Sequence, residues 1–152
     1  MAELKVGDQA PDFTLPTDGN GAIKLSDLTG KNCIVYFYPK DDTPGCTIEA
    51  KDFTEFYQAF QDKNAEIIGI SKDSVAKHDK FKSKYDLAFT LGSDEEGNVC
   101  ENYGVWVEKN MYGRKYMGIE RATFLVGEDG KIKQIWRKVK AKGHAEEVLG
   151  AV

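Results

Sequence analysis

The sequence has few of the residues that mark several common classes of protein. Only three of its 152 residues are cysteine, and no two of them have the CxxC spacing of a redox pair or a zinc site. An odd and sparse set of cysteines is also a poor disulfide framework, so we expect a reducing compartment. No repeat, low-complexity tract or Pro/Gly/Ser-rich linker is present. The sequence therefore predicts one domain spanning residues 1–152.

Charge and hydropathy argue against two further classes of partner. The formal net charge is −4 and the mean hydropathy is −0.50, whereas a nucleic-acid-binding surface needs a basic excess. The longest apolar run, residues 33–38, has the length of a strand and not of a membrane span. The first residues, Met-Ala-Glu-Leu-Lys-Val-Gly-Asp, hold no apolar core of signal-peptide length. We expect a cytoplasmic protein that binds neither nucleic acid nor membrane.

The sequence does contain an alternation of strand and helix patterns. Residues 34–38 form a near-continuous apolar run, which is typical of a central strand covered on both faces. Residues 46–60 carry apolar side chains at helical spacing. The other elements expected are an N-terminal hairpin over 13–25, strands at 66–71 and 89–91, helices at 74–85, 98–103 and 143–149, and a hairpin over 122–136. This order predicts an α/β thioredoxin-like fold with an added N-terminal β-hairpin and an inserted helix.

The most informative stretch is residues 39–49, Pro-Lys-Asp-Asp-Thr-Pro-Gly-Cys-Thr-Ile-Glu. It follows the C-terminal end of the predicted central strand, where open α/β sheets place their ligand sites. Thr43 is a good N-cap and Pro44 suits the first helical position, so Cys46 falls in the first turn of a helix. Unpaired N–H groups and the positive end of the helix dipole favour a thiolate there, which makes the cysteine a nucleophile. The alternative is that Cys46 is only a buried core residue.

These residue types suit the reduction of a peroxide. A thiolate that attacks an O–O bond needs donors that hold the peroxide and stabilise the departing oxygen. The Thr43 hydroxyl and the amides of Gly45 and Cys46 can be such donors, and Pro39 can shield the thiolate from water. Glu49, one helical turn after Cys46, is expected either to orient an arginine or to lie on the surface near the helix start.

The spacing Pro39-x-x-x-Thr43-x-x-Cys46 resembles the active-site motif of the peroxiredoxins. The surrounding Tyr-Phe-Tyr-Pro-Lys and Thr-Pro-Gly-Cys-Thr resemble the bacterioferritin comigratory protein (PrxQ) subgroup, and the similarity continues through Gly118-Ile-x-Arg121-x-Thr-Phe-Leu-Val. The combination is far more specific than one short motif. The resemblance implies a thioredoxin-fold hydroperoxide reductase that needs no metal or organic cofactor.

By this resemblance Cys46 is the peroxidatic cysteine and Thr43 and Pro39 are its motif partners. Arg121 is then the guanidinium that completes the site. Its position supports this independently, because Arg121 opens the apolar run 122–126. If that strand is antiparallel to the central one, Arg121 lies at the edge where Cys46 sits and can stabilise a thiolate. The alternative is an ordinary strand-end arginine in solvent.

The sequence departs from its relatives in how Cys46 would be recycled. Many members of the subgroup carry a resolving cysteine five residues after the peroxidatic one, and here that position is Lys51. Cys33, at the start of the central strand, is expected to be inert. We therefore expect an external thiol (thioredoxin, glutaredoxin or a small thiol) to reduce oxidised Cys46, with Cys100 second and an intersubunit disulfide third. The expected quaternary state is a monomer or at most a weak dimer.

Two rival functions fit the same fold. A thiol–disulfide oxidoreductase needs a CxxC pair, which is missing, while a non-catalytic thioredoxin-fold binding module predicts an unreactive Cys46. For His78 and His144 we expect structural or solvated roles and no part in catalysis. We therefore interpret the chain as a thiol-dependent peroxidase that reduces hydrogen peroxide and organic hydroperoxides through Cys46.

Overall fold

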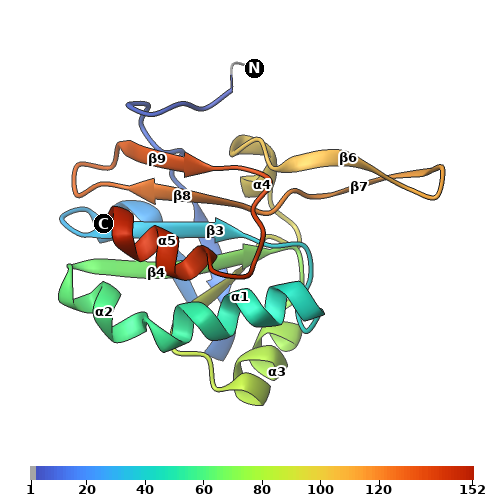
Figure 1. The fold of residues 1–152 in the computed structure, drawn as a ribbon, viewed down its shortest axis with the longest axis horizontal. Helices are drawn as coiled ribbons and strands as arrows, with labels where there is room; N and C mark the ends of the chain where they lie inside the picture. The colour runs from blue at the N-terminus through green and yellow to red at the C-terminus, as the bar shows by residue number, and fades with distance from the viewer. Residues whose placement is uncertain (1–2) are drawn as a thin grey trace.

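The computed structural model describes residues 3–152, which form a seven-stranded sheet covered by helices and a separate two-stranded hairpin (Figure 1). The elements in chain order are β1 (Thr14–Thr17), η1 (Asp18–Asn20), β2 (Gly21–Lys24), η2 (Leu25–Leu28), β3 (Asn32–Phe37), α1 (Pro44–Glu55), α2 (Tyr57–Asp62), β4 (Ala65–Ser71), α3 (Val75–Tyr85), β5 (Thr90–Ser93), α4 (Val99–Asn102), β6 (Trp106–Met111), β7 (Arg114–Ile119), β8 (Ala122–Val126), β9 (Ile132–Trp136) and α5 (His144–Ala151). The sheet order is β2-β1-β5-β4-β3-β8-β9. No helix within residues 3–152 is long and apolar enough to cross a membrane.

Strand β3 is an interior strand of the sheet, next to the middle strand β4, as its apolar run predicts. It pairs in parallel with β4 and antiparallel with β8, so that Val35 lies opposite Ile68 on one side and Phe124 on the other. All of its residues from Cys33 onward are buried. The predicted α/β class, the N-terminal hairpin β1–β2 and the hairpin β8–β9 are confirmed.

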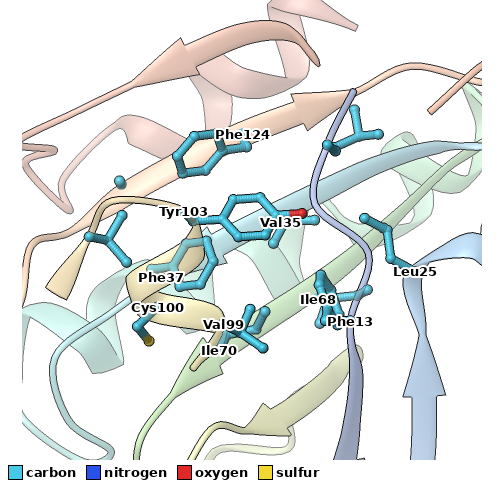
Figure 2. Packing of buried hydrophobic residues seen from close by; sticks show 14 of the residues in the cluster. Phe13, Leu25, Val35, Phe37, Ile68, Ile70, Val99, Cys100, Tyr103 and Phe124 are labelled. Carbon is cyan, nitrogen blue, oxygen red and sulfur yellow. The ribbon is translucent and has the colours of Figure 1, made fainter. Parts of the chain in front are cut away.

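Alternate side chains of β3 enter two different cores, because successive residues of a strand point to opposite faces of the sheet. Val35 and Phe37 pack with Tyr103 and Cys100, around the short helix α4 (Figure 2). Tyr36 and its alternate neighbours pack instead under α1, α2, α3 and α5, in the cluster that contains Cys46, Ala50 and Phe53. The sheet therefore separates Cys46 from Cys100.

Two local features differ from the sequence prediction. The single helix expected over 46–60 is two helices, because Phe56 has φ −94° and ψ 6° between α1 and α2. The hairpin β6–β7, which projects from the body of the molecule in Figure 1, was not predicted. Most of its side chains are exposed or half-buried, so its strands lack the apolar alternation of a core strand. Its turn places Tyr112 and Gly113 at positive φ without the usual Asn-Gly or Asp-Gly signal.

Because Gly69 of β4 has no side chain, the buried ring of Tyr36 lies directly over its backbone. The same ring stacks on Phe53, with ring centroids 4.7 Å apart. A Cβ at Gly69 would lie 2.9 Å from Tyr36 Cζ and Oη. We expect Gly69→Ala to lower the free energy of unfolding by about 1–3 kcal/mol, measured by urea denaturation. The control is Gly150→Ala, because none of the described atoms lies within 4 Å of that added Cβ. Because Gly150 lies in helix α5, the Gly150→Ala substitution should be neutral or stabilising by up to about 1 kcal/mol. Equal effects at the two sites would contradict this account.

Candidate active site

The site begins where the central strand ends and the chain crosses to α1. Pro39 follows directly on the buried Tyr38 and is exposed. Thr43 is the N-cap of α1 as expected, with φ −99° and ψ 156°, but its hydroxyl donates to the Lys40 carbonyl at 2.8 Å. Within residues 3–152, no helix amide donates to the Thr43 hydroxyl oxygen. Thr43 folds the connection back on itself and leaves the amide end of the helix open.

Cys46 lies in the first turn of α1, with Pro44 at the first helical position. The first intrahelical hydrogen bond runs from the Thr47 amide to the Thr43 carbonyl at 2.8 Å. The amides of Gly45 and Cys46 precede that bond, so they are among the N–H groups that a helix leaves unpaired at its start. Cys46 itself is only 1% exposed. The turn thus presents helix-start donors beside a thiol that is shielded from bulk water.

Arg121 reaches this turn from the neighbouring strand. The antiparallel register pairs Phe37 with Ala122, so Arg121 comes to the same sheet edge as the start of α1. Its Nη2 lies 3.3 Å from Cys46 Sγ, and its side chain is 15% exposed. A Cβ on Gly45 would lie 3.1 Å from the same Nη2, so the guanidinium lies directly against the first turn. The alternative of a strand-end arginine in solvent is wrong.

Glu49 lies on the other side of the guanidinium. Arg121 Nη1 donates to Glu49 Oε1 at 2.7 Å, and the glutamate is fully buried, so the surface position considered for it is wrong. Burial raises the pKa of Glu49 to about 7, although the charge of Arg121 acts in the opposite direction. Its Oε2 has no hydrogen-bond partner among the described residues. Glu49 therefore fixes the guanidinium through one oxygen and titrates near neutral pH.

Cys33 and Cys100 have surroundings that differ from those of Cys46. Both are buried in the cluster on the opposite face of the sheet. Burial raises the pKa of each thiol well above its ordinary value, and a nearby carboxylate, Glu66 for Cys33 and Asp94 for Cys100, raises it further. Of the three cysteines, Cys46 is the one whose sulfur accepts a hydrogen bond from a guanidinium.

Sequence reasoning did not find Lys109, because this residue lies on the unpredicted β6–β7 hairpin. Burial and the nearby charge of Arg121 both lower the pKa of Lys109. Lys109 lines a cleft with Pro39, Trp106 and Tyr116, so the hairpin forms one wall of a cleft beside Pro39. Within residues 3–152, no group of three or more His, Cys, Asp or Glu side chains could hold a metal ion.

The fold and this turn define the class of protein. A thioredoxin-like sheet that brings an arginine to a cysteine in the first turn of a helix is the arrangement expected of a peroxiredoxin. Residues 6–135 match the AhpC/TSA family. The chain belongs to this family, and within it to the Bcp/PrxQ peroxiredoxins.

Individual relatives agree over almost the full length. The chain is 54% identical over 147 residues to the putative peroxiredoxin bcp of Coxiella burnetii, covering 97% of each chain. It is 48% identical to peroxiredoxin Bcp of Bacillus subtilis, covering 96% of this chain and 93% of that one. Among solved structures it resembles the Xanthomonas campestris bacterioferritin comigratory protein, studied for alkyl peroxide reduction, with a TM-score of 0.89, 43% identity and coverage of 97% and 94%. A Xylella fastidiosa PrxQ mutant gives a TM-score of 0.94 at 39% identity, covering 99% and 96%.

The raised pKa of Glu49 predicts a pH dependence of stability. The ordinary value is 4.5 and the folded value about 7, so the folded state keeps a proton that the unfolded state has released. This contribution favours folding fully below about pH 4.5 and is lost as the pH rises through about 7. The Glu49→Gln variant retains an oxygen that accepts from Arg121 but cannot titrate, so it should not lose this stability as the pH rises. Relative to wild type, we expect its free energy of unfolding to rise by on the order of 3 kcal/mol between pH 4 and 8.

Urea denaturation at each pH measures this difference, and Glu55→Gln is the matched control, because Glu55 is exposed at the end of the same helix. The control should track the wild type. A difference between Glu49→Gln and wild type that stays constant with pH would mean that Glu49 has the same pKa in the folded and unfolded states.

Proposed function

We propose that the chain reduces hydroperoxides with the Cys46 thiolate as the attacking group. The observation that carries the proposal is the 3.3 Å contact from Arg121 Nη2 to Cys46 Sγ at the start of α1. A fixed positive charge and the amide end of a helix both interact favourably with the negative charge of an attacking thiolate. The named activity of the Xanthomonas campestris relative, alkyl peroxide reduction, supports the same chemistry here.

The reaction follows from these groups. The thiolate attacks the terminal oxygen of R–O–O–H, so that an S–O bond forms and the O–O bond breaks. The electron pair of the broken bond stays on the departing RO⁻, which takes up a proton and leaves as an alcohol, or as water from hydrogen peroxide. Sulfur is oxidised by two electrons and becomes the sulfenic acid of Cys46.

Each neighbouring residue has a separate part in this step. Arg121 stabilises the thiolate and donates to the peroxide oxygens, and the amides of Gly45 and Cys46 are further donors for the departing oxygen. Thr43 adds a hydroxyl at the end of the connection that it folds against Lys40. Pro39, exposed between the strand end and the β6–β7 cleft, limits the access of water to the thiolate.

Recycling depends on a thiol from outside the chain, such as thioredoxin, glutaredoxin or a small thiol. Lys51 occupies the position of the usual resolving cysteine and is exposed on α1. Cys100 lies in the core on the opposite face of the sheet. The external thiol forms a disulfide with Cys46 and releases the oxygen as water, and a second thiol then frees Cys46. We expect the active unit to be one domain, a monomer or weak dimer, in the cytoplasm.

Peroxide consumption with dithiothreitol as reductant tests the nucleophile and the guanidinium together. Cys46→Ser should have no activity, and Cys33→Ser, which alters a buried thiol on the other face, should retain it. Arg121→Lys keeps the charge but loses the planar fork, so we expect a ten- to thousand-fold loss in reactivity, about the effect of removing one oxyanion donor. Full turnover by Cys46→Ser would refute the proposal, and an unchanged rate in Arg121→Lys would remove Arg121 from the reaction.

The product of a single turnover tests the recycling route. Because a disulfide requires Cα atoms within about 7 Å and the sheet separates the two thiols, one equivalent of peroxide should leave Cys46 as a sulfenic acid that dimedone traps. Intact mass spectrometry should show the gain of one oxygen, and a high peroxide dose should add a second as sulfinic acid. The loss of two hydrogens, mapped by digestion to Cys46–Cys100, would instead establish a two-cysteine enzyme.

A further inference from the structure

Helix α3 holds both aspartates of the connection between β3 and α1. Asp41 is buried, and its Oδ2 lies 2.6 Å from His78 Nδ1, while Tyr38 donates to its Oδ1 at 2.5 Å. The next residue, Asp42, accepts hydrogen bonds from Lys84 and Tyr85 at the solvent-exposed end of α3. The attachment through Asp41 is buried and involves a titratable pair, whereas the attachment through Asp42 is exposed to solvent.

The buried contact requires a proton. His78 Nε2 lies 2.9 Å from the Gly92 carbonyl, which can only accept, so Nε2 carries a hydrogen. Asp41 Oδ2 and His78 Nδ1 then face each other, and without a hydrogen between them both are acceptors. Because the two atoms are 2.6 Å apart, the pair shares a second proton, which makes it a buried imidazolium–carboxylate pair.

Other polar groups surround the pair. Asp73, after β4, accepts from the Asp41 amide at 2.8 Å, and Tyr38 Oη lies 3.5 Å from His78 Nδ1. Burial lowers the pKa of His78. The carboxylate of Asp41 raises it, and the Gly92 carbonyl and the charge of Asp73 raise it further, so the pKa lies above its ordinary value of 6.5. The pair therefore stabilises the closed connection fully below about pH 6.5, and this stabilisation is lost as the pH rises through the raised value.

We propose that His78 is a positioning residue of the peroxidase: by sharing a proton with Asp41 it latches residues 38–43, and with them the first turn of α1, in the closed arrangement. The inference rests on the proposed function for its purpose. Cys46 is 1% exposed and an external thiol has to reach its sulfur, so the connection has to open once in each cycle. When the shared proton is lost, two acceptors face each other at 2.6 Å and the latch is released.

Substitution of Asp41 separates the latch from a merely structural contact. In Asp41→Asn the amide nitrogen can donate to an unprotonated His78 Nδ1, while the amide oxygen still accepts from Tyr38. The connection then stays closed without the second proton, and its closure no longer depends on pH. His78→Gln, which can donate to the Asp41 carboxylate, is the second variant with the same expectation. His144→Gln, which alters the other buried histidine, is the control.

The first readout is amide hydrogen exchange of residues 38–48, expressed as protection factors and followed in the Cys46→Ser background, in which the reactive sulfur is absent. Protection should fall at least ten-fold between pH 6 and 9 in the protein that keeps Asp41 and His78, and equally in the His144→Gln control. It should stay constant over this range in Asp41→Asn and in His78→Gln. Glu49 titrates in this range but is present in every variant, so its effect cancels in the comparison. The same pH profile with Asp41 and with Asn at position 41 would overturn the proposal.

The second readout needs no variant. The ¹⁵N resonances of His78 should report a doubly protonated ring at pH 6, and a neutral ring with its hydrogen on Nε2 at that pH would overturn the latch. Neither readout uses peroxide. A chain that consumes no peroxide but shows both signatures would therefore refute the proposed function alone, and a fully active chain without them would refute the latch alone.

Discussion

The guanidinium of Arg121 binds two acidic groups at once, the sulfur of Cys46 and the carboxylate of Glu49. Both groups are almost completely buried, and a buried anion without a partner costs several kcal/mol. A planar fork with fixed donors can serve both, whereas the single ammonium of a lysine cannot match the two directions. This one side chain therefore contacts the cysteine, the buried glutamate and the first turn of α1.

The same turn is held from a second direction. Arg121 reaches it from the sheet, while His78, Lys84 and Tyr85 of α3 hold the two aspartates that precede it. Fixing a connection at both ends favours the geometry needed for attack on a peroxide, because the donors do not have to be ordered during the reaction. It also shields the sulfur from the reductant. A site closed this tightly needs a defined way to open, and a protonated pair in its attachment is well suited to that purpose.

The central sheet divides the cysteines by environment. Its two faces carry separate cores, so Cys33 and Cys100 share one apolar environment that keeps their thiols protonated, while Cys46 lies in the other, beside a cation. Lys51 is exposed on the same helix as Cys46, and Cys46 is the one of the three thiols that contacts a guanidinium. The β6–β7 hairpin, which contributes Lys109, forms one wall of the cleft beside Pro39.

The sequence alone determined the parts that depend on neighbouring residues. The apolar run of β3, the Thr43-Pro44 helix start and the placement of Cys46 in the first turn follow from local propensity and capping. The tertiary structure decided which side chains are buried and paired. Arg121 and Cys46 are 75 residues apart, and only the antiparallel register of β3 and β8 brings them together. Glu49 and His78 occur in amphipathic helical patterns that suit a core or a surface equally well, so their roles depend on the elements that pack against them. Strands β6 and β7 carry little local signal, because only Trp106 and Ile119 at one end pack on the core, while most of their other side chains are exposed or half-buried.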